Sequence, residues 1–322
     1  MVDNNTIKQA MNSTCDEAYF PALGNYRKGK VRDLYDIGDK LIIVVTDRIS
    51  AFDAQLKQAI PFKGRALNQI TTFWFDKVKD VVPNHIISSP HPNVLIVKKA
   101  NPYPIEMIIR GYATGSLWRA YEKGDRIKCG VSLPDGLKKD QKFPEPILTP
   151  TTKSEHDEDI TREEIIKQGL VPKEVYEKME AITKELFKRG QEFAAKQGLI
   201  LVDTKYEFAE YKGELILIDE VHTGDSSRFW VNSEYEEHFN KGDKQRSIDK
   251  EYIRQWLLDQ GFKYGQEVPD LPEDVVITAS QRYIEEFEKL TGQKFEVIKS
   301  NKSIKENIKE ELIKEGLLCW FQ

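Results

Sequence analysis

Cysteine is scarce in this sequence, and long hydrophobic runs are missing. The three cysteines, Cys15, Cys129 and Cys319, lie far apart and form no CxxC pair. Neither a disulfide framework nor a zinc site is therefore expected, and a reducing cytoplasm suits the chain best. No run approaches the roughly 20 apolar residues that a membrane helix needs, and the polar stretch MVDNNTIKQAMNSTCDEAYF lacks the apolar centre of a signal peptide. We expect a cytoplasmic protein without a membrane partner.

An excess of one charge sign is missing as well. The chain has 48 Lys and Arg residues against 53 Asp and Glu residues, and its net charge is −5. This balance gives no general reason to expect a nucleic-acid partner. With 322 residues, of which 39% are hydrophobic, the chain is long enough for one large or two medium-sized domains with a real core.

The stretch GNYRKGKVRDLY (24–35) is close to a phosphate-binding P-loop but lacks its hydroxyl residue. Two glycines and Lys30 have the P-loop spacing, whereas Val31 stands where the motif needs Ser or Thr to hold magnesium. A hairpin pattern with a Gly-Asp turn follows instead of a helix. The sequence therefore favours a basic β-strand that carries Lys30 and Arg32 on one face. A merely solvated strand face is the alternative.

Apolar runs and helical patterns divide the rest of the chain. Short apolar runs predict strands at 40–46, 93–100 and 104–112, with a helical stretch before the second of them. Residues 130–161 are rich in Pro, Gly, Asp and Thr and are expected to form a long loop. Amphipathic patterns predict two helices within 161–197 and further helices at about 249–260, at about 273–290 and in the C-terminal tail.

A predicted hairpin at 199–221 contains the most informative polar residues. Asp203, Lys205 and Glu207 are two residues apart and therefore project from one face of its first strand. Its second strand is an apolar run that ends in Asp219. Carboxylates that converge with a lysine suit magnesium, which takes oxygen ligands and accompanies phosphates. An ordinary salt bridge on a solvated strand is the alternative at this point.

Three loops offer further polar groups. In HTGDSSRFW, Ser227 and Arg228 are suited to a phosphate or carboxylate, which arginine binds in a bidentate manner. In RGYATGSLW, Ser116 precedes a helical stretch and is either a helix N-cap or part of an anion site. Lys153 and His156 belong to the long loop, and His156 has no second histidine at metal spacing, so zinc is not expected.

Six motifs, in this order, resemble one enzyme family. They are GKVRDLY, TDRISAFD, EMIIRGYATGSLW, PTTKSEHDE, DTKYEF and DEVHTGDSSRFW. Together they are similar to the phosphoribosylaminoimidazole-succinocarboxamide synthases, or SAICAR synthetases, of de novo purine biosynthesis. The resemblance covers residues 24–295, and it implies nothing about the C-terminal tail.

This resemblance implies an activity and a fold. The family is an ATP-dependent ligase that joins the carboxylate of a carboxylated aminoimidazole ribotide (CAIR) to the amine of L-aspartate, with Mg²⁺ and through an acyl phosphate. Its fold is α+β and two-lobed, similar to protein kinases and ATP-grasp enzymes, with ATP bound between the lobes. The implied domains are a β-rich ATP-binding lobe at 1–105 and a larger α/β lobe for substrate and metal at 106–295. The helical tail at 296–322 is expected from its own amphipathic pattern, and its role is unknown. The oligomeric state stays open, between a monomer and a small homo-oligomer.

The resemblance also implies roles for the hairpin residues. Asp203 and Lys205 are expected to orient the reacting carboxylate and offset its charge. Glu207 and Asp219 are the expected magnesium ligands, and Asp219 thereby also contributes to ATP binding. Phosphoryl transfer needs mainly positioning and charge neutralisation, which agrees with the lack of a Ser-His-Asp or Cys-His arrangement. The general base for the aspartate amine is not identifiable.

The other implied roles concern ATP and the two acceptor substrates. Lys30 and Arg32 are expected to face the ATP phosphates, and the backbone from Glu106 to Ile108 is expected to hold the adenine. The remaining residues are expected to bind the ribotide or aspartate: Arg110, Ser116, Ser227, Arg228, Asp47, Ser50, Asp53, Lys153 and His156.

Two other functions remain as alternatives. A small-molecule kinase of similar architecture would use the same carboxylates and lysine, but it would phosphorylate a hydroxyl group and would not need aspartate. A nucleic-acid-binding module would use the basic stretch 27–32, although no aromatic platform accompanies it. Dependence of ADP release on both L-aspartate and CAIR distinguishes the ligase from the kinase.

Overall fold

The structure is a computed structural model, and it describes residues 2–52, 54–154, 157–248, 251–263, 265–298 and 300–319. The chain divides into two compact units. Unit 1 consists of Met1–Phe75, His85–Lys99 and Asp249–Gln322, and unit 2 consists of Asp76–Asn84 and Ala100–Ile248. The division into lobes at 105 and 295 was drawn from expected function, and it stays a prediction.

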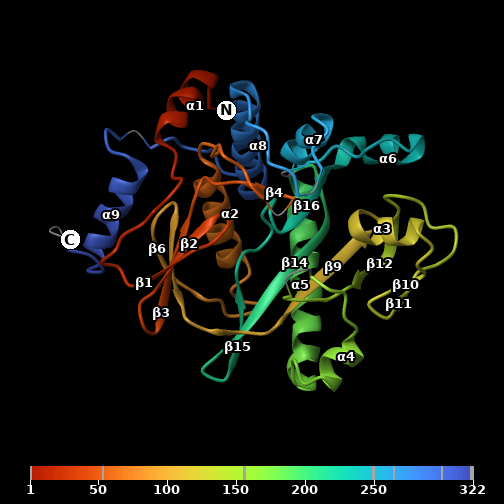
Figure 1. The fold of residues 1–322 in the computed structure, drawn as a ribbon. Coiled ribbons are helices and arrows are strands. Elements are labelled where there is room, and N and C mark those ends of the chain that lie inside the picture. Colours follow the sequence, from red (N-terminus) through yellow and green to blue (C-terminus); the bar gives the residue numbers. More distant parts are fainter. Residues whose placement is uncertain are drawn as a thin grey trace. The chain divides into compact units, whose positions relative to one another are not determined.

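Unit 1 is built on an antiparallel five-stranded sheet in the order β1-β2-β3-β7-β6 (Figure 1). Its strands are β1 (Asn25–Lys28), β2 (Arg32–Asp36), β3 (Lys40–Val45), β6 (Ile86–His91) and β7 (Val94–Lys98). A separate pair is formed by β4 (Ser50–Ala51) and β5 (Ala54–Gln55). The predicted hairpin is confirmed, because β2 and β3 pair in register across the Gly-Asp turn.

The segment around Lys30 differs from the prediction. Lys30 lies in the connection between β1 and β2, and only Arg32 belongs to a strand. Arg48 accounts for this difference, since its guanidinium donates hydrogen bonds to the carbonyl oxygens of Gly29 (3.0 Å) and Lys30 (3.2 Å) and pairs with the buried Asp33 (2.7 Å). Carbonyl groups that bind this buried arginine do not continue the sheet ladder. The single strand predicted through Lys30 and Arg32 is therefore wrong.

Helices complete unit 1. They are α1 (Asn4–Ala10), a 3₁₀ turn (Met11–Ser13), α2 (Lys63–Lys77), α7 (Glu251–Asp259), α8 (Glu273–Thr291) and α9 (Ile304–Lys314). The helices predicted from the amphipathic patterns at 249–260, at 273–290 and in the tail are confirmed. Helix α1 was not predicted, although Asp3 is its N-cap and accepts a hydrogen bond from the Thr6 amide.

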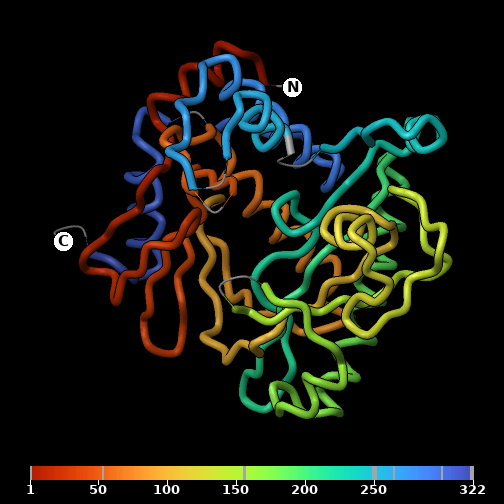
Figure 2. Tube along the Cα trace, turned by 45° about the vertical axis from the view of Figure 1, so that its right-hand side comes forward, coloured from red at the N-terminus to blue at the C-terminus, as the bar shows by residue number. Residues whose placement is uncertain are grey.

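The C-terminal tail is part of the core of unit 1. Ser303 and Glu306 form a capping box that starts α9. The buried face of α9 carries Ile308 and Leu312, which belong to the same hydrophobic cluster as Tyr35 on β2. In Figure 2 the blue trace of the C-terminal segment runs beside the red N-terminal part of the chain. The family resemblance implied nothing about this segment, and the structure assigns it a packing role.

Unit 2 is built on a seven-stranded sheet with β14 at its centre. The main order is β12-β9-β14-β15, while β13 also pairs with β9, and β8 and β16 also pair with β14. The strands are β8 (Asn101–Pro102), β9 (Ile105–Tyr112), β12 (Lys142–Leu148), β13 (Thr151–Thr152), β14 (Leu199–Tyr211), β15 (Glu214–Ile218) and β16 (Ser227–Val231). A small hairpin of β10 (Ile127–Lys128) and β11 (Val131–Ser132) stands apart.

The long loop predicted at 130–161 is wrong, because β11, β12 and β13 lie within it. Two prolines, Pro144 and Pro146, made the stretch resemble a loop, but β12 is an edge strand, where a missing N–H group is tolerated. The segment bends back along β9, and the amide of Thr149 donates to the Ile108 carbonyl at 2.8 Å. This return brings the residues that follow Thr149 close to β9 and β14.

The helices of unit 2 are α3 (Gly115–Glu122), α4 (Arg162–Lys167), α5 (Lys173–Lys196) and α6 (Asn232–Lys241). The two helices predicted within 161–197 are confirmed as α4 and α5. Helix α5 places Met179, Leu186 and Phe187 on one buried face, which packs against β14 and β9. The α+β class is confirmed. Among the described residues, no helix combines the length and apolar character needed to cross a membrane.

Candidate active site

The hairpin of β14 and β15 positions the central polar residues. Its turn residues, Lys212 and Gly213, both have positive φ angles (54° and 84°), as a type I′ turn requires. The register that follows pairs Glu207 with Ile218, so Asp219 comes directly after the end of β15. The predicted hairpin and its turn are thus confirmed.

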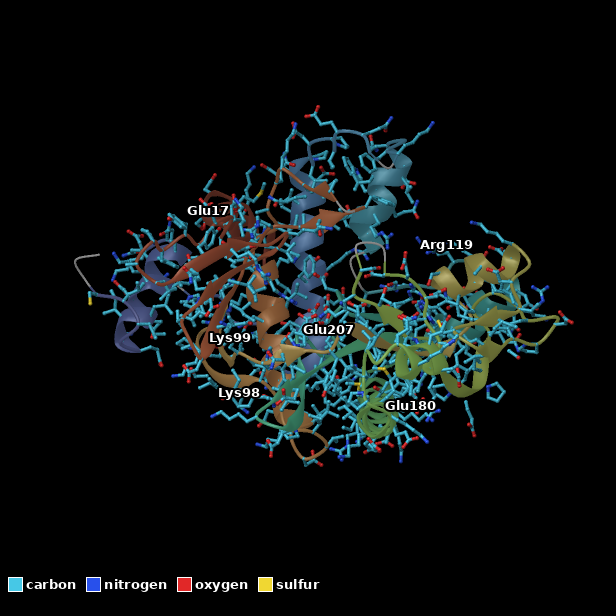
Figure 3. The ribbon with its side chains drawn as sticks, turned by 60° about the horizontal axis from the view of Figure 1, so that its bottom comes forward. Glu17, Lys98, Lys99, Arg119, Glu180 and Glu207 are labelled. Atoms are coloured by element: carbon cyan, nitrogen blue, oxygen red, sulfur yellow. The ribbon has the colours of Figure 1, made fainter. Side chains whose placement is uncertain are left out.

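Lys205 lies at the centre of a cluster of carboxylates. Its Nζ is 2.8 Å from Glu106 Oε1 on β9, 3.1 Å from Glu207 Oε1 and 4.0 Å from Asp219 Oδ2. Lys153, which follows β13, pairs with the other oxygen of Glu207. These five residues, Glu106, Lys153, Lys205, Glu207 and Asp219, are called the Lys205 cluster below; Glu207 is labelled in Figure 3.

The charges in the Lys205 cluster perturb one another. Burial alone would lower the pKa of Lys205, but Asp219, Glu207 and Glu106 together outweigh burial and raise it. Burial and the nearby Asp219 carboxylate raise the pKa of Glu207 to about 7, against the opposing effect of Lys205 and Lys153. Three carboxylates face two cations here, so the cluster has excess negative charge for a further cation to offset.

A second cluster lies on the same face of β14. Asp203 Oδ2 accepts hydrogen bonds from Arg110 Nη1 (3.3 Å) and Arg228 Nη1 (3.2 Å), which come from β9 and β16. Arg110 also donates to the hydroxyls of Thr149 (2.9 Å) and Ser116 (3.3 Å). These residues, Arg110, Ser116, Thr149, Asp203 and Arg228, are called the Arg110 cluster.

The Arg110 cluster has excess positive charge. Arg110 is buried, and its burial lowers the pKa of the guanidinium even though Asp203 opposes the effect. Two guanidinium groups share one carboxylate, and arginine is the residue best suited to hold a phosphate or carboxylate through paired hydrogen bonds. The arrangement favours an anionic ligand.

Helix α3 begins close to this cluster. Gly115 has φ +62°, and a Cβ atom there would lie 2.8 Å from both Arg228 Nη atoms, so glycine lets the guanidinium lie against the backbone. The N-cap of α3 is Thr114, which makes no side-chain capping bond. The N-cap alternative for Ser116 is therefore wrong, and its hydroxyl instead accepts from Arg110.

Ser227 is held beside the Arg110 cluster at the start of β16. Its hydroxyl donates to Thr204 Oγ1 at 2.8 Å, across the pairing of β16 with β14. The preceding turn is fixed by Thr223, whose hydroxyl donates to the buried Glu220 carboxylate at 2.7 Å. Both serine and turn are therefore positioned by buried hydrogen bonds.

Other predicted residues lie in unit 1. Lys30 is exposed, Arg32 is half-buried, and Ser50 begins β4. Asp47 is buried, and its two carboxylate oxygens accept hydrogen bonds from the amides of Cys15 (2.8 Å) and Gly64 (2.9 Å).

Three further predictions concern Asp53, His156 and the strand segment from Glu106 to Ile108. Asp53 and His156 lie outside the described residues. In this segment, Met107 and Ile108 pair with β14, and Glu106 pairs with β13. The adenine role of this backbone stays a prediction.

Sequence reasoning missed two contributions. Thr149 was not a candidate, although it stands directly before the PTTKSEHDE motif. Glu106 was considered for its backbone, whereas its carboxylate contacts Lys205. A carboxylate on a strand that is otherwise apolar was the available signal for Glu106.

The Lys205 cluster offers donors suited to magnesium. No group of three or more His, Cys, Asp or Glu side chains within the described part of the chain is arranged as a metal cage. Magnesium is usually held by only one or two carboxylates together with substrate phosphates and water. The hard oxygens of Glu207 and Asp219 fit this requirement.

Comparison with known proteins gives one consistent result. The sequence model of the family described as SAICAR synthetase matches residues 25–271 of this chain. A phosphoribosylaminoimidazole-succinocarboxamide synthase of Bacteroides thetaiotaomicron is 50% identical over 300 residues, covering 91% of this chain and 95% of that protein. The structure of SAICAR synthase from Saccharomyces cerevisiae complexed with SAICAR matches with a TM-score of 0.79 and 34% identity, covering 88% of this chain and 100% of that one. A SAICAR synthetase in complex with ADP matches with a TM-score of 0.64 and 28% identity, covering 85% and 100%.

Proposed function

The chain belongs to the SAICAR synthetase family, and from this premise we infer that it is an ATP-dependent ligase of de novo purine biosynthesis. It joins the carboxylate of CAIR to the amine of L-aspartate and forms SAICAR, ADP and phosphate. ATP is the co-substrate. The small-molecule kinase alternative is set aside, because relatives at this level of identity are ligases.

One observation supports this reaction most directly: the Lys205 cluster, with excess negative charge, and the Arg110 cluster, with excess positive charge, lie on one face of β14. Asp203, Lys205 and Glu207 alternate along the strand, so neighbouring members are separated by about 7 Å. That spacing is suited to a substrate carboxylate that approaches a metal-bound triphosphate. A carboxylate and a triphosphate repel each other, and a site that joins them must supply several positive charges.

For the Lys205 cluster we propose metal binding and charge compensation. Glu207 and Asp219 would hold Mg²⁺, which supplies charge neutralisation of the ATP phosphates when bound. Lys205 is fixed by Glu106 at 2.8 Å and would present its ammonium group to the phosphoryl group as it moves. Lys153 would contribute a further cation from the segment after β13.

For the Arg110 cluster we propose recognition of the ribotide. Arg110 and Arg228 would hold the ribotide phosphate or the imidazole carboxylate, and the hydroxyls of Ser116 and Ser227 would add hydrogen bonds. Asp203 keeps the two guanidinium groups together through one oxygen. Its role would be to orient both arginines and the reacting carboxylate next to them.

The other site assignments remain proposals from the family resemblance. Lys30 and Arg32 would face the ATP phosphates, and the segment from Glu106 to Ile108 would hold the adenine. The remaining proposed contacts to the ribotide or aspartate are those of Asp47, Ser50, Asp53 and His156. A cytoplasmic location and the oligomeric state also remain predictions.

The proposed route has two steps. A carboxylate oxygen of CAIR attacks the γ-phosphorus of ATP, the bond to the β,γ-bridging oxygen breaks, and ADP leaves. The amine of aspartate then attacks the acyl carbon, phosphate leaves with the carboxylate oxygen, and the nitrogen loses a proton. These residues position and neutralise the reactants, and none of them needs to act as a covalent nucleophile.

A coupled ADP-release assay tests the function. ADP should appear only when ATP, CAIR and L-aspartate are all present, and omission of any one should reduce the rate to background. ADP release with CAIR and ATP alone, at the full rate, would indicate a kinase-like activity instead. With ¹⁸O in the CAIR carboxylate, the label should appear in the released phosphate, whereas unlabelled phosphate would contradict the acyl-phosphate route.

A further inference from the structure

Unit 1 contains a cavity of about 640 Å³, whose lining shares only Asp47 with the residues proposed above to contact the substrates. Its walls come from α1, the start of α2, the turn between β6 and β7, and the segment 294–307 that leads into α9. In Figure 1, α1 lies beside α8, and Gln281 on α8 donates a hydrogen bond to Asn4 at 2.6 Å. The N- and C-terminal parts of the chain thus enclose this space together.

We propose that this cavity binds a small phosphate monoester with a polyhydroxyl body, such as a sugar phosphate, and that Arg65 holds the phosphate. Arg65 lies on the first turn of α2, and its guanidinium stacks over the ring of Phe295 at 4.9 Å. Its Nε donates to Gln69 at 3.1 Å. Within the described residues, Arg65 forms no ion pair, and its two Nη groups donate no hydrogen bond to the protein; the carboxylate of Glu296 acts on it only at longer range.

A half-buried arginine in a cavity wall that forms no ion pair is only partly neutralised, because the Glu296 carboxylate acts on it only at longer range. Burial lowers the pKa of Arg65 and outweighs the opposing effect of the Glu296 carboxylate, which reflects the cost of the arginine charge in this position. A phosphate would supply the missing counterion and accept from both Nη groups at once. Lys294, which is exposed at the rim, adds a second cation on the same wall.

The acidic residues of the cavity already have hydrogen-bond donors. Asp3 accepts from the amide and the hydroxyl of Thr6, and Asp47 accepts from two backbone amides. Their oxygens are therefore not available to neutralise Arg65. His91 also lines the cavity, and burial lowers the pKa of its imidazole to about 4, so it is neutral near pH 7 and accepts from the Asn93 amide at 3.1 Å.

The rest of the lining suits a ligand that is larger than phosphate. Hydroxyl and amide groups are supplied by Thr6, Gln9, Ser13, Asn93 and Asn307. This volume is within the range of small-molecule sites, which combine an apolar surface with a few polar groups that fix orientation. Thr6, Ser13, Asn93 and Asn307 already have protein hydrogen-bond partners. Their oxygen atoms can still accept from the hydroxyl groups of a polyhydroxyl body, whereas an aliphatic body would only cover them.

The test measures binding of ribose 5-phosphate by isothermal titration. It is performed in the Arg228→Gln background, so that the proposed ribotide site does not contribute. Ribose 5-phosphate is expected to bind, and Arg65→Gln should weaken it at least tenfold. Arg282→Gln is the matched control, because Arg282 is also half-buried in unit 1 and also stacks on an aromatic ring, that of Tyr252 at 4.6 Å. It should leave binding unchanged.

Three outcomes would overturn the proposal: no binding in the Arg228→Gln background, equal affinity with and without Arg65→Gln, or equal affinity for ribose 5-phosphate and inorganic phosphate. If Arg65→Gln does not fold, as judged by circular dichroism, Lys294→Gln should weaken binding in the same direction, because Lys294 is exposed and its replacement does not disturb packing. The catalytic rate of Arg65→Gln should stay normal, which separates this site from the proposed reaction.

Discussion

Replacement of Asp219 by asparagine separates the proposed metal site from the fold. Asp219 has φ +67°, and asparagine is one of the few residues that adopts this left-handed conformation readily. Asp219→Asn removes one negative charge without changing the shape of the side chain. Lys205 keeps two closer carboxylates, those of Glu106 at 2.8 Å and Glu207 at 3.1 Å, so it does not become an unpaired buried charge.

The expected loss of stability is small. The Asp219 and Lys205 charges are 4.0 Å apart with side chains 20% and 31% exposed, and a pair of this kind contributes about 1 kcal/mol or less. Removal of the Asp219 charge also relieves its repulsion of Glu207, whose pKa it helps to raise. The free energy of unfolding should therefore change by at most about 1 kcal/mol.

The expected loss of activity is large. Loss of one of two proposed magnesium ligands removes charge stabilisation where phosphoryl transfer takes place, and a single such interaction is worth roughly 3 to 4 kcal/mol, or about 10²–10³ in kcat. The measurement is ADP release at saturating substrates and increasing Mg²⁺, together with urea unfolding of the same preparations. Asp243→Asn, in the exposed turn after α6, is the control and should be unaffected in both assays. Near-normal ADP release by folded Asp219→Asn protein would refute the metal assignment.

Three further predictions concern side chains packed inside one unit or the other. His222 is buried, and burial lowers its pKa to about 3, so the folded state resists protonation that the unfolded chain accepts near pH 6.5. The stabilising contribution of neutral His222 is full above pH 6.5, and the free energy of unfolding measured in urea should fall by about 2 kcal/mol between pH 7 and 5. The His222→Asn protein should lack this part of the pH dependence. If its free energy of unfolding falls with pH as steeply as that of the unchanged protein, the reasoning is contradicted. Gly190→Ala would place a Cβ atom 2.5 Å from His222 and 2.6 Å from Leu201. The overpacking should cost about 1–3 kcal/mol and exceed the gain of about 1 kcal/mol in helix propensity, so the protein should be less stable. A Gly190→Ala protein that unfolds at a higher urea concentration would show that the contact relaxes. Ile308→Ala should destabilise unit 1 by about 2–5 kcal/mol, whereas the exposed Lys314→Ala should change little; equal effects would mean that α9 is not part of the core.

Much of the local structure followed from the sequence because it depends on short-range patterns. The alternation of Asp203, Lys205 and Glu207 is enough to place them on one face of a strand. The amphipathic spacing of α5 and α8 predicted both helices. Predictions failed where a distant residue decided the outcome, as when Arg48 bound the backbone at Lys30 and prevented a continuous strand.

The composition of the stretch 130–161 was misleading for a related reason. Proline indicates a loop when only the local sequence is considered, but an edge strand pairs on one side only and tolerates proline. Whether β12 is at an edge depends on the order of the sheet, which is not a local property. Thr149 was missed as a member of the Arg110 cluster for the same reason.

The sequence by itself determined the family, the reaction and most of the residues that carry charge in the candidate site. Tertiary structure alone decided which of these charges meet: Glu106 with Lys205 across β9 and β14, and Arg228 with Asp203 across β14 and β16. It also decided that Arg65 and Lys294, far apart in the chain, line one cavity. Side-chain periodicity and turn conformation depend on neighbouring residues, whereas contacts between strands and the closure of a cavity depend on how the whole chain packs.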